Sequence, residues 1–329
     1  MELGKISESI LKRSVLKYVQ QNNKNVAPNS ELLVGAGVGV DAAVFKDMAV
    51  ATKTSIGRNR MVVVEAMINA CNNLSSSGAI PTAAQISLLL PEALYESELR
   101  HMMEEAVDFA TKHNIVISGG HTAVSKYVSE TIATATLFGK VTDFKSRPME
   151  PGMDVVISKW IGLQGTAKIA SLKSDILEKR FPKWFVAGAK RFDEFALVNE
   201  EANVAKKANV CAMHDISGGG VFRALWELAE LAGTGIRVEL KKIPVKQETI
   251  EVCEVFGLNP YELLSGGALL MVTGNGEELV EQLLEADIPA TLIGQLTDNK
   301  DKVLVTYGED GEELRYLDKP RTDEIDKIL

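Results

Sequence analysis

Three short segments of the chain combine glycines with hydroxyl, imidazole or carboxylate side chains. In chain order they are residues 72–79, 118–122 and 214–220. Glycines allow backbone N–H groups to approach an oxyanion, as in the backbone nests that hold phosphate. A helix that begins beside such a turn adds unpaired donors and the positive end of its dipole. The second and third segments therefore predict a site for a phosphate group.

The second segment, SGGHT, follows the apolar run 115–117, so we expect it just beyond the carboxyl end of a strand. Ligands commonly bind at that position in α/β folds. The alternative is a tight strand-to-helix turn without a ligand. The candidate ligand-binding residues are Ser118, Gly119, Gly120 and Thr122, and the candidate catalytic residue is His121.

The third segment, HDISGGG, is expected between a short strand at 210–213 and a helix that opens near Val221. Its alternative is a capped loop in which the histidine meets a backbone carbonyl. A further glycine turn at 264–268 is interpreted as structural. The candidates here are His214 and Asp215 for catalysis, and Gly218 and Gly219 for phosphate binding.

Composition restricts the class of protein. Of 329 residues, 46% are hydrophobic and 25% charged, which is the balance of a soluble globular protein. A net charge of −9 and the lack of a basic stripe argue against a nucleic-acid partner. No apolar run is long enough to span a membrane and no signal peptide is visible, so we expect a cytoplasmic protein. Three widely spaced cysteines predict neither disulfides nor zinc.

Helices and strands must position these segments. Near residues 147–152, two prolines and a glycine interrupt the hydrophobic periodicities of both helix and strand. We therefore predict one domain at 1–148 and another at 149–329. The expected helices and strands before the boundary are an opening helix capped by Ser7, a β-hairpin at 31–54, helices at 61–77 and 95–113, and strands at 83–90, 115–118 and 128–138. After it we expect a strand at 154–158, helices at 164–180, 189–208, 219–232, 246–256 and 276–286, and strands near 210, 236, 269, 291 and 303.

Together with residues 39–44 (GVDAAV), the three segments occur in the order found in the ATP-dependent superfamily that contains aminoimidazole ribonucleotide synthetase (PurM). Selenophosphate synthetase, thiamine-monophosphate kinase and the hydrogenase-maturation dehydratase HypE belong to it. Residues 5–11 and 256–260 resemble the HypE branch most. The resemblance implies an α+β, PurM-like two-domain fold. Its N-terminal β-rich α/β domain forms a barrel across a homodimer, and its C-terminal domain is α+β.

The same resemblance implies that ATP is bound by the N-terminal domain and lies in the cleft between the two domains, with Asp41 and Asn73 among the residues around the phosphates. The reaction would transfer the γ-phosphoryl group to a small-molecule or carbamoyl-type substrate, or dehydrate it through phosphorylation. A maturation partner protein is a further implied partner. The alternative is a member that has lost catalysis and serves as a nucleotide sensor or assembly partner.

Several carboxylates of the family's magnesium site are replaced in this chain. The aspartate expected before Asp41 is Val40, another is Lys53, and the Asn-Asp element reads Asn72-Asn73. Asp41 and Asp215 remain as candidate metal ligands, so a reduced Mg²⁺ site is the most that the pattern supports. Lys53 is a candidate catalytic cation on the triphosphate, and the alternative is that it points to solvent from a strand end.

The tail also departs from the HypE pattern. That pattern ends in Pro-Arg-Ile/Val-Cys, whereas this chain has PRTD at 320–323 and no cysteine there. Self-dehydration of a tail thiocarboxamide is therefore excluded by the missing thiol. Thiamine-monophosphate kinase activity would require the absent acidic cluster, and no amino-terminal cysteine or lysine pair supports selenophosphate synthesis.

Overall fold

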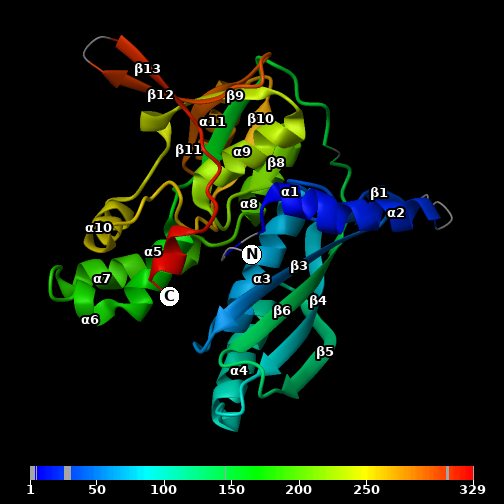
Figure 1. Ribbon diagram of the computed structural model, residues 1–329, viewed down its shortest axis with the longest axis vertical. Coiled ribbons are helices and arrows are strands. Elements are labelled where there is room, and N and C mark those ends of the chain that lie inside the picture. The colour runs from blue at the N-terminus through cyan, green and yellow to red at the C-terminus, as the bar shows by residue number, and fades with distance from the viewer. Residues whose placement is uncertain (1–3, 5, 26–30, 145, 309–310, 329) are drawn as a thin grey trace. The chain divides into compact units, whose positions relative to one another are not determined.

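The computed structural model describes residues 4, 6–25, 31–144, 146–308 and 311–328 (Figure 1). The chain forms two compact units. The smaller unit comprises Ser30–Gly35 and Asp41–Asp143, and the larger unit comprises Met1–Asn29, Ala36–Val40 and Phe144–Leu329. The last segment of the larger unit begins at Phe144, and the N-terminal helical segment belongs to the same unit.

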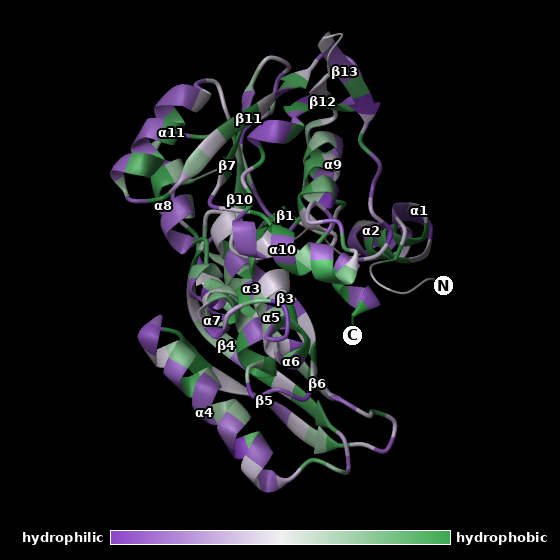
Figure 2. Cartoon of the chain, turned by 90° about the vertical axis from the view of Figure 1, so that its left-hand side faces the viewer, coloured by the Kyte–Doolittle hydropathy of each residue, from purple (hydrophilic) through white to green (hydrophobic). Residues whose placement is uncertain are grey.

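The smaller unit is a six-stranded sheet with the order β1-β2-β3-β6-β4-β5, in which only β4 and β5 run parallel. Helix α3 contacts β3, β4 and β6, and α4 contacts α3 and β5. Figure 2 shows that α4 carries hydrophilic and hydrophobic residues, and its buried positions, Met102, Ala106 and Ala110, recur every four residues. The elements are β1 (Leu32–Val34), β2 (Ala43–Phe45), β3 (Met48–Gly57), α3 (Val62–Ser76), β4 (Ile80–Leu90), α4 (Glu96–Lys112), β5 (Val116–Val124) and β6 (Thr131–Lys140).

The two faces of this sheet differ in burial. Along β3 and β6 the alanines are buried on the face toward α3. The opposite face carries paired threonine hydroxyls, Thr52 with Thr136 at 3.0 Å and Thr54 with Thr134 at 2.9 Å. This second face, called here the threonine face, has exposed or half-buried side chains along both strands. This division of faces follows from the alternation of side chains along a strand.

The larger unit contains a seven-stranded sheet with the order β13-β12-β9-β11-β7-β10-β8. Helix α9 packs on one face of it, and α8 and α11 pack on the other. The elements, in chain order, are β7 (Asp154–Ser158), α5 (Leu163–Leu172), α6 (Ser174–Leu177), α7 (Lys183–Lys190), η2 (Arg191–Phe195), α8 (Asn199–Lys207), β8 (Ala212–Asp215), α9 (Gly220–Ala232), β9 (Gly235–Glu239), η3 (Leu240–Lys242), α10 (Gln247–Phe256), β10 (Leu269–Thr273), α11 (Gly276–Glu285), β11 (Ala290–Thr297), β12 (Lys302–Gly308), β13 (Gly311–Tyr316) and η4 (Glu324–Lys327).

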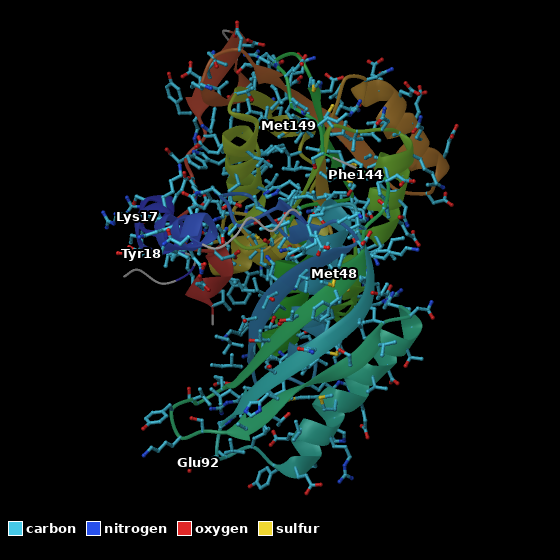
Figure 3. All side chains as sticks on the ribbon, turned by 90° about the vertical axis from the view of Figure 1, so that its right-hand side faces the viewer. Lys17, Tyr18, Met48, Glu92, Phe144 and Met149 are labelled. Carbon is cyan, nitrogen blue, oxygen red and sulfur yellow. The ribbon has the colours of Figure 1, made fainter. Side chains whose placement is uncertain are left out.

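The N-terminal helix is continuous through α1 (Glu8–Leu11), the π-helical η1 (Lys12–Leu16) and α2 (Lys17–Asn25). The predicted cap is wrong in detail, because the Ser7 hydroxyl lies 3.2 Å from that of Ser9 and makes no cap bond. Lys17 and Tyr18 project from this helix in Figure 3. Among the described residues, no helix has both the length and the apolar character needed to cross a membrane.

A buried ion pair joins two layers of the larger unit. The Lys159 ammonium, directly after β7, lies 2.5 Å from a Glu201 carboxylate oxygen on α8. It also donates to the backbone carbonyls of Phe195 at 3.0 Å and Leu197 at 2.7 Å. Burial raises the pKa of Glu201, with the lysine acting in the opposite direction. The lysine therefore neutralises a buried carboxylate and donates to two backbone carbonyls.

We predict that Lys159→Met lowers the free energy of unfolding by about 3–5 kcal/mol, because it leaves a carboxylate and two carbonyls buried without their cation. Urea denaturation measures the loss. The control is Lys183→Met at an exposed position, expected to change stability by no more than about 0.5 kcal/mol. Equal midpoints for the two variants would show that the pair contributes nothing.

Candidate functional site

A polar cluster forms one corner of the smaller unit, where the start of β2 meets the end of α3. The Asn73 side-chain amide donates to the backbone carbonyl of Asp41 at 2.7 Å, and the Ser76 hydroxyl donates to the Asp41 carboxylate at 3.3 Å. These two helical residues are three apart, so they share one face of α3. Both are buried, and the Asn73 amide oxygen has no hydrogen-bond partner among the described residues. The cluster therefore combines a carboxylate that accepts a hydrogen bond from α3 with a buried amide oxygen that has no partner among the described residues.

Lys53 belongs to the same corner. It lies in the middle of β3, so the alternative of a strand-end residue is wrong. It shares its face with the buried Ala51 and Ser55, which is the face covered by α3. Strand β2 pairs with β3 so that Ala43 is opposite Val50, three residues before Lys53, and Asp41 lies two residues before β2. Lys53 and the polar corner are therefore both on the α3 side of the sheet, close to the pairing of β2 with β3.

The SGGHT segment lies inside a strand, not after one. Strand β5 continues to Val124, so the predicted strand end at 118 and the turn that followed it are both wrong. Ser118 is the extra residue of a β-bulge, because Ile117 pairs with Ala84 and Gly119 pairs with the next residue, Gln85. The Ser118 hydroxyl donates to the Ala84 carbonyl at 3.1 Å.

Gly120 is required by the close approach of the neighbouring strand. It has a φ of +153°, and a Cβ there would lie 1.7 Å from the Ile86 carbonyl oxygen. His121 and Thr122 follow it in register with Ser87 and Leu88 of β4. The glycines thus serve strand pairing here, and the histidine is exposed on an edge strand.

The sheet separates His121 from the polar corner within one copy of the chain. Strands β3, β6 and β4 lie between β2 and β5, which amounts to about 19 Å at the usual strand spacing. His121 also pairs with the exposed Ser87, on the face opposite to α3. In Figure 3, Met48 and Glu92 mark opposite ends of the sheet, and the corner lies toward the Met48 end. One copy of this unit does not bring Asp41 and His121 to the same ligand.

The HDISGGG segment lies in the larger unit, and its first two residues are strand residues. His214 and Asp215 complete β8 and are 2% and 4% exposed. Gly219 has a φ of +87° and is the N-cap of α9, which begins at Gly220 as predicted. A Cβ on Gly220 would lie 2.4 Å from the Tyr261 carbonyl oxygen, so this position also excludes a side chain. Gly218 precedes the cap with no such restriction.

His214 faces a buried charge network. Its Nε2 lies 3.7 Å from a Glu227 carboxylate oxygen, and the Arg223 guanidinium donates to the same carboxylate at 3.1 Å. Lys319 of the C-terminal tail lies 3.7 Å from Glu227 and 3.4 Å from Glu8 of the N-terminal helix. The predicted catalytic role for His214 is not supported by this position, because its ring contacts a structural carboxylate and is almost fully buried.

Asp323, whose carboxylate binds the start of α9, was not identified from the sequence. The Asp323 carboxylate accepts hydrogen bonds from the backbone N–H groups of Gly219 at 2.6 Å, Leu264 at 3.0 Å and Ile325 at 2.9 Å. Burial raises the pKa of this carboxyl, and the three N–H donors act in the opposite direction. No local pattern connects Asp323 to a turn a hundred residues earlier, so only the folded chain reveals it.

The residues present do not fit a magnesium cluster. Within the described part of the chain, no group of three histidine, cysteine or acidic side chains could hold a metal ion. The amide of Asn73 contacts the Asp41 backbone directly, where a carboxylate would need a cation between the two oxygens. The two candidate metal ligands, Asp41 and Asp215, belong to different units. The cysteines are buried and free, and burial raises the pKa of Cys71 and Cys253 to about 12, so neither is a reactive thiol.

Two family models match the chain. The N-terminal domain of AIR synthase related proteins matches residues 39–141, and the C-terminal domain matches residues 150–306. A putative hydrogenase expression/formation protein of Methanocaldococcus jannaschii is 26% identical over 99% of this chain and 97% of its own length. Carbamoyl dehydratase HypE of Escherichia coli is 25% identical over 80% of this chain and 77% of its own length.

Solved structures share the fold at lower identity. HypE in a HypE–HypF complex matches with a TM-score of 0.70 and 20% identity, over 92% of this chain and 99% of that one. AaThiL complexed with AMPPCP and TMP has a TM-score of 0.70 and 19% identity, over 92% and 96%. HypE in complex with ATP has a TM-score of 0.64 and 17% identity, over 97% of both chains. With both domain models matched in order, the chain belongs to the AIR synthase related proteins of the PurM-like superfamily, in the branch that includes HypE.

Proposed function

We propose that this protein binds ATP and transfers its γ-phosphoryl group to a small-molecule or carbamoyl-type substrate, or dehydrates that substrate through phosphorylation. The observation that carries the proposal is the polar corner of the smaller unit, where direct hydrogen bonds join Asp41, Asn73 and Ser76 on the side of the sheet that Lys53 also faces. ATP or an ATP analogue is bound in two of the solved structures that share the fold. The match over 97% of a hydrogenase expression/formation protein favours the HypE-like form of this reaction.

Lys53 supplies the positive charge in this proposal. Transfer of a phosphoryl group requires cations or donors that neutralise charge on its oxygens. No group of three acidic, histidine or cysteine side chains that could hold a metal is found among the described residues, whereas a lysine ammonium acts as a point charge on phosphate. We therefore expect nucleotide binding that depends on the lysine more than on magnesium.

Calorimetric titration with AMPPCP, first with magnesium and then with EDTA, tests this arrangement. We expect binding in both conditions, with a change in Kd of less than about threefold, and a loss of about tenfold or more in Lys53→Met, as expected for a charged hydrogen bond. Lys140→Met, an exposed lysine of the same unit, is the matched control. Binding that disappears in EDTA would assign the charge to a metal, and no binding in either condition would remove ATP from the proposal.

A second copy of the chain is the proposed partner for the threonine face. This face is left without a helical cover in the smaller unit and carries half-buried apolar side chains such as Ile132 beside its threonine pairs. His121 lies on the same side of the sheet. In a homodimer, the second copy is the one that could bring its β5 to a nucleotide held at the polar corner, because the sheet separates the two within one copy.

We predict a homodimer of twice the 35.7 kDa chain mass in size-exclusion chromatography with light scattering. Thr134→Arg places a charge at the centre of the threonine face, and we expect it to give a monomer. Thr111→Arg, at an exposed position on α4, introduces the same charge elsewhere and should remain dimeric. A Thr134→Arg dimer would exclude this face as the interface.

The second candidate function is a nucleotide-binding sensor or assembly partner without turnover. The direct contact from Asn73 to the Asp41 carbonyl, in a family whose site is acidic by resemblance, favours it. A HypE is complexed with HypF in one solved structure, and a maturation partner for the present chain is part of this alternative.

Release of inorganic phosphate from ATP separates the two candidates. For the enzyme we expect measurable release in the presence of a carbamoyl-type substrate, and its loss in Asp41→Ala, since that variant removes the carboxylate at the polar corner. Asp47→Ala, an exposed aspartate of the same unit, is the control. Tight AMPPCP binding with no release in any condition would favour the sensor.

A further inference from the structure

The helices α6 and α7 carry large apolar side chains that the core does not use. Both helices contact α5 in the larger unit (Figure 1), and residues 172–190 are called here the α6–α7 segment. Its inner side is attached through Leu177, which is buried in the core cluster shared with α5 and α10. On its outer side Trp184 is 73% exposed, and Leu172 and Ile176 are 48% and 46% exposed. A group of large exposed apolar side chains commonly marks a surface that binds another surface.

The exposed tryptophan lies beside two further aromatic rings. The rings of Phe181 and Phe185 are stacked with their centroids 4.7 Å apart, and the Trp184 ring meets that of Phe185 edge to face at 6.0 Å. Both phenylalanines are half-buried. The tryptophan therefore packs on an aromatic base while most of its own ring remains in contact with water. An indole ring, apolar with one polar N–H, is suited to the boundary between water and an apolar phase.

The charge of the segment is opposite in sign to that of the chain. The segment contains five lysines or arginines and two acidic residues, whereas the whole chain has a net charge of −9. The Arg180 guanidinium is paired with the Glu254 carboxylate at 3.6 Å. Lys173, Lys179 and Lys183 form no ion pair among the described residues. The segment thus combines unpaired ammonium groups with exposed apolar side chains, and its charge attracts an anionic surface.

The type of cation favours a lipid surface over an acidic protein. Protein interfaces are depleted of lysine and enriched in arginine, and the arginine of this segment is already paired. Anionic headgroups attract lysine through its charge, with no need for a fixed hydrogen-bond geometry. A lysine stem lies along an apolar boundary while its ammonium stays in water. Surface-bound helices of peripheral proteins likewise combine lysine with tryptophan, phenylalanine and leucine.

We propose that the α6–α7 segment binds the surface of anionic membranes, with Trp184 inserted at the level of the headgroups and Lys179 and Lys183 facing the lipid phosphates. This is attachment to one face of a bilayer and requires no membrane-spanning helix. The lysines bring the segment to the surface, and burial of the indole ring stabilises the bound state. The proposal is independent of nucleotide binding, because the polar corner belongs to the other unit.

Co-sedimentation of the full chain with lipid vesicles tests the proposal. We expect binding to vesicles of phosphatidylcholine with about 30% phosphatidylserine. Binding to phosphatidylcholine alone should be about a hundredfold weaker, since each of three lysines near an anionic surface contributes about fivefold. Raising the salt concentration to about 0.5 M should weaken binding to the anionic vesicles, because salt screens exposed charges.

The tryptophan is tested by Trp184→Ala, which removes the exposed ring. We expect binding to the anionic vesicles to weaken about tenfold, because the apolar area available for insertion is lost. Tyr316→Ala removes a 68% exposed aromatic ring elsewhere in the same unit and should bind as the unaltered chain does. Tryptophan fluorescence gives a second measurement. The anionic vesicles should shift the emission of the unaltered chain to shorter wavelength, and this shift should be absent in Trp184→Ala.

The lysines are tested by the double variant Lys179→Glu and Lys183→Glu, which reverses two exposed charges. We expect it to lose binding to the anionic vesicles by more than about a hundredfold. The matched control is Lys207→Glu with Lys241→Glu, the same reversal at exposed positions outside the segment, and it should retain most of the binding.

Three results would overturn the proposal. One is no binding of the unaltered chain to the anionic vesicles. Another is binding that Trp184→Ala and the charge-reversed variant leave unchanged. The third is a shift of tryptophan emission with soluble poly-L-glutamate but not with the vesicles, which would assign the segment to an acidic protein surface.

Discussion

The backbone N–H groups at the start of α9 have to be satisfied, and the larger unit is arranged around that requirement. Glycines at 219 and 220 allow the chain to turn sharply from β8 into the helix, but they leave donors that no local side chain can reach. The Asp323 carboxylate accepts one hydrogen bond from the Gly219 N–H and another from the Leu264 N–H in the second glycine turn. Asp323 therefore joins the tail, the helix and the second turn.

A network of buried charges beside this helix also connects it to distant segments of the chain. Glu227 of α9 receives Arg223 and Lys319, and His214 of β8 lies within reach of it. Arg223 also donates to the Pro320 carbonyl, so the network touches the tail directly. A histidine beside an aspartate at a strand end suggests catalysis when only the sequence is seen. In the fold, its Nε2 lies 3.7 Å from the Glu227 carboxylate of α9.

In the smaller unit, the sheet determines which side chains can lie on the same face. A side chain in a sheet is assigned to one face by its parity, and no local adjustment moves it to the other. Lys53 and the polar corner lie on the α3 face, and His121 lies on the threonine face. The order of the motifs along the chain does not show on which face of the sheet each residue lies. That depends on how the strands pair.

The sequence predicted the elements well where periodicity was long. Helix α3 was expected at 61–77 and lies at Val62–Ser76, and α10 was expected at 246–256 and lies at Gln247–Phe256. It failed where glycines were read as the end of an element, since the bulge at Ser118 lets β5 continue through Gly119 and Gly120. It also failed for the late hairpin strand β13, and for contacts between distant segments such as Asp323 with Gly219. Those depend on tertiary packing, for which local patterns carry no signal.

The first and last of the three segments of the larger unit flank the smaller unit in the sequence, and Lys319 pairs with Glu8 to join the first helix to the last segment. During synthesis, the smaller unit can therefore complete its sheet while the larger unit still lacks β7 to β13. The N-terminal helix cannot make its contact with Lys319 until almost the entire polypeptide has been synthesised. Domains generally fold as units as they leave the ribosome. In this chain the middle should fold first, and the beginning should be among the last parts to find its place.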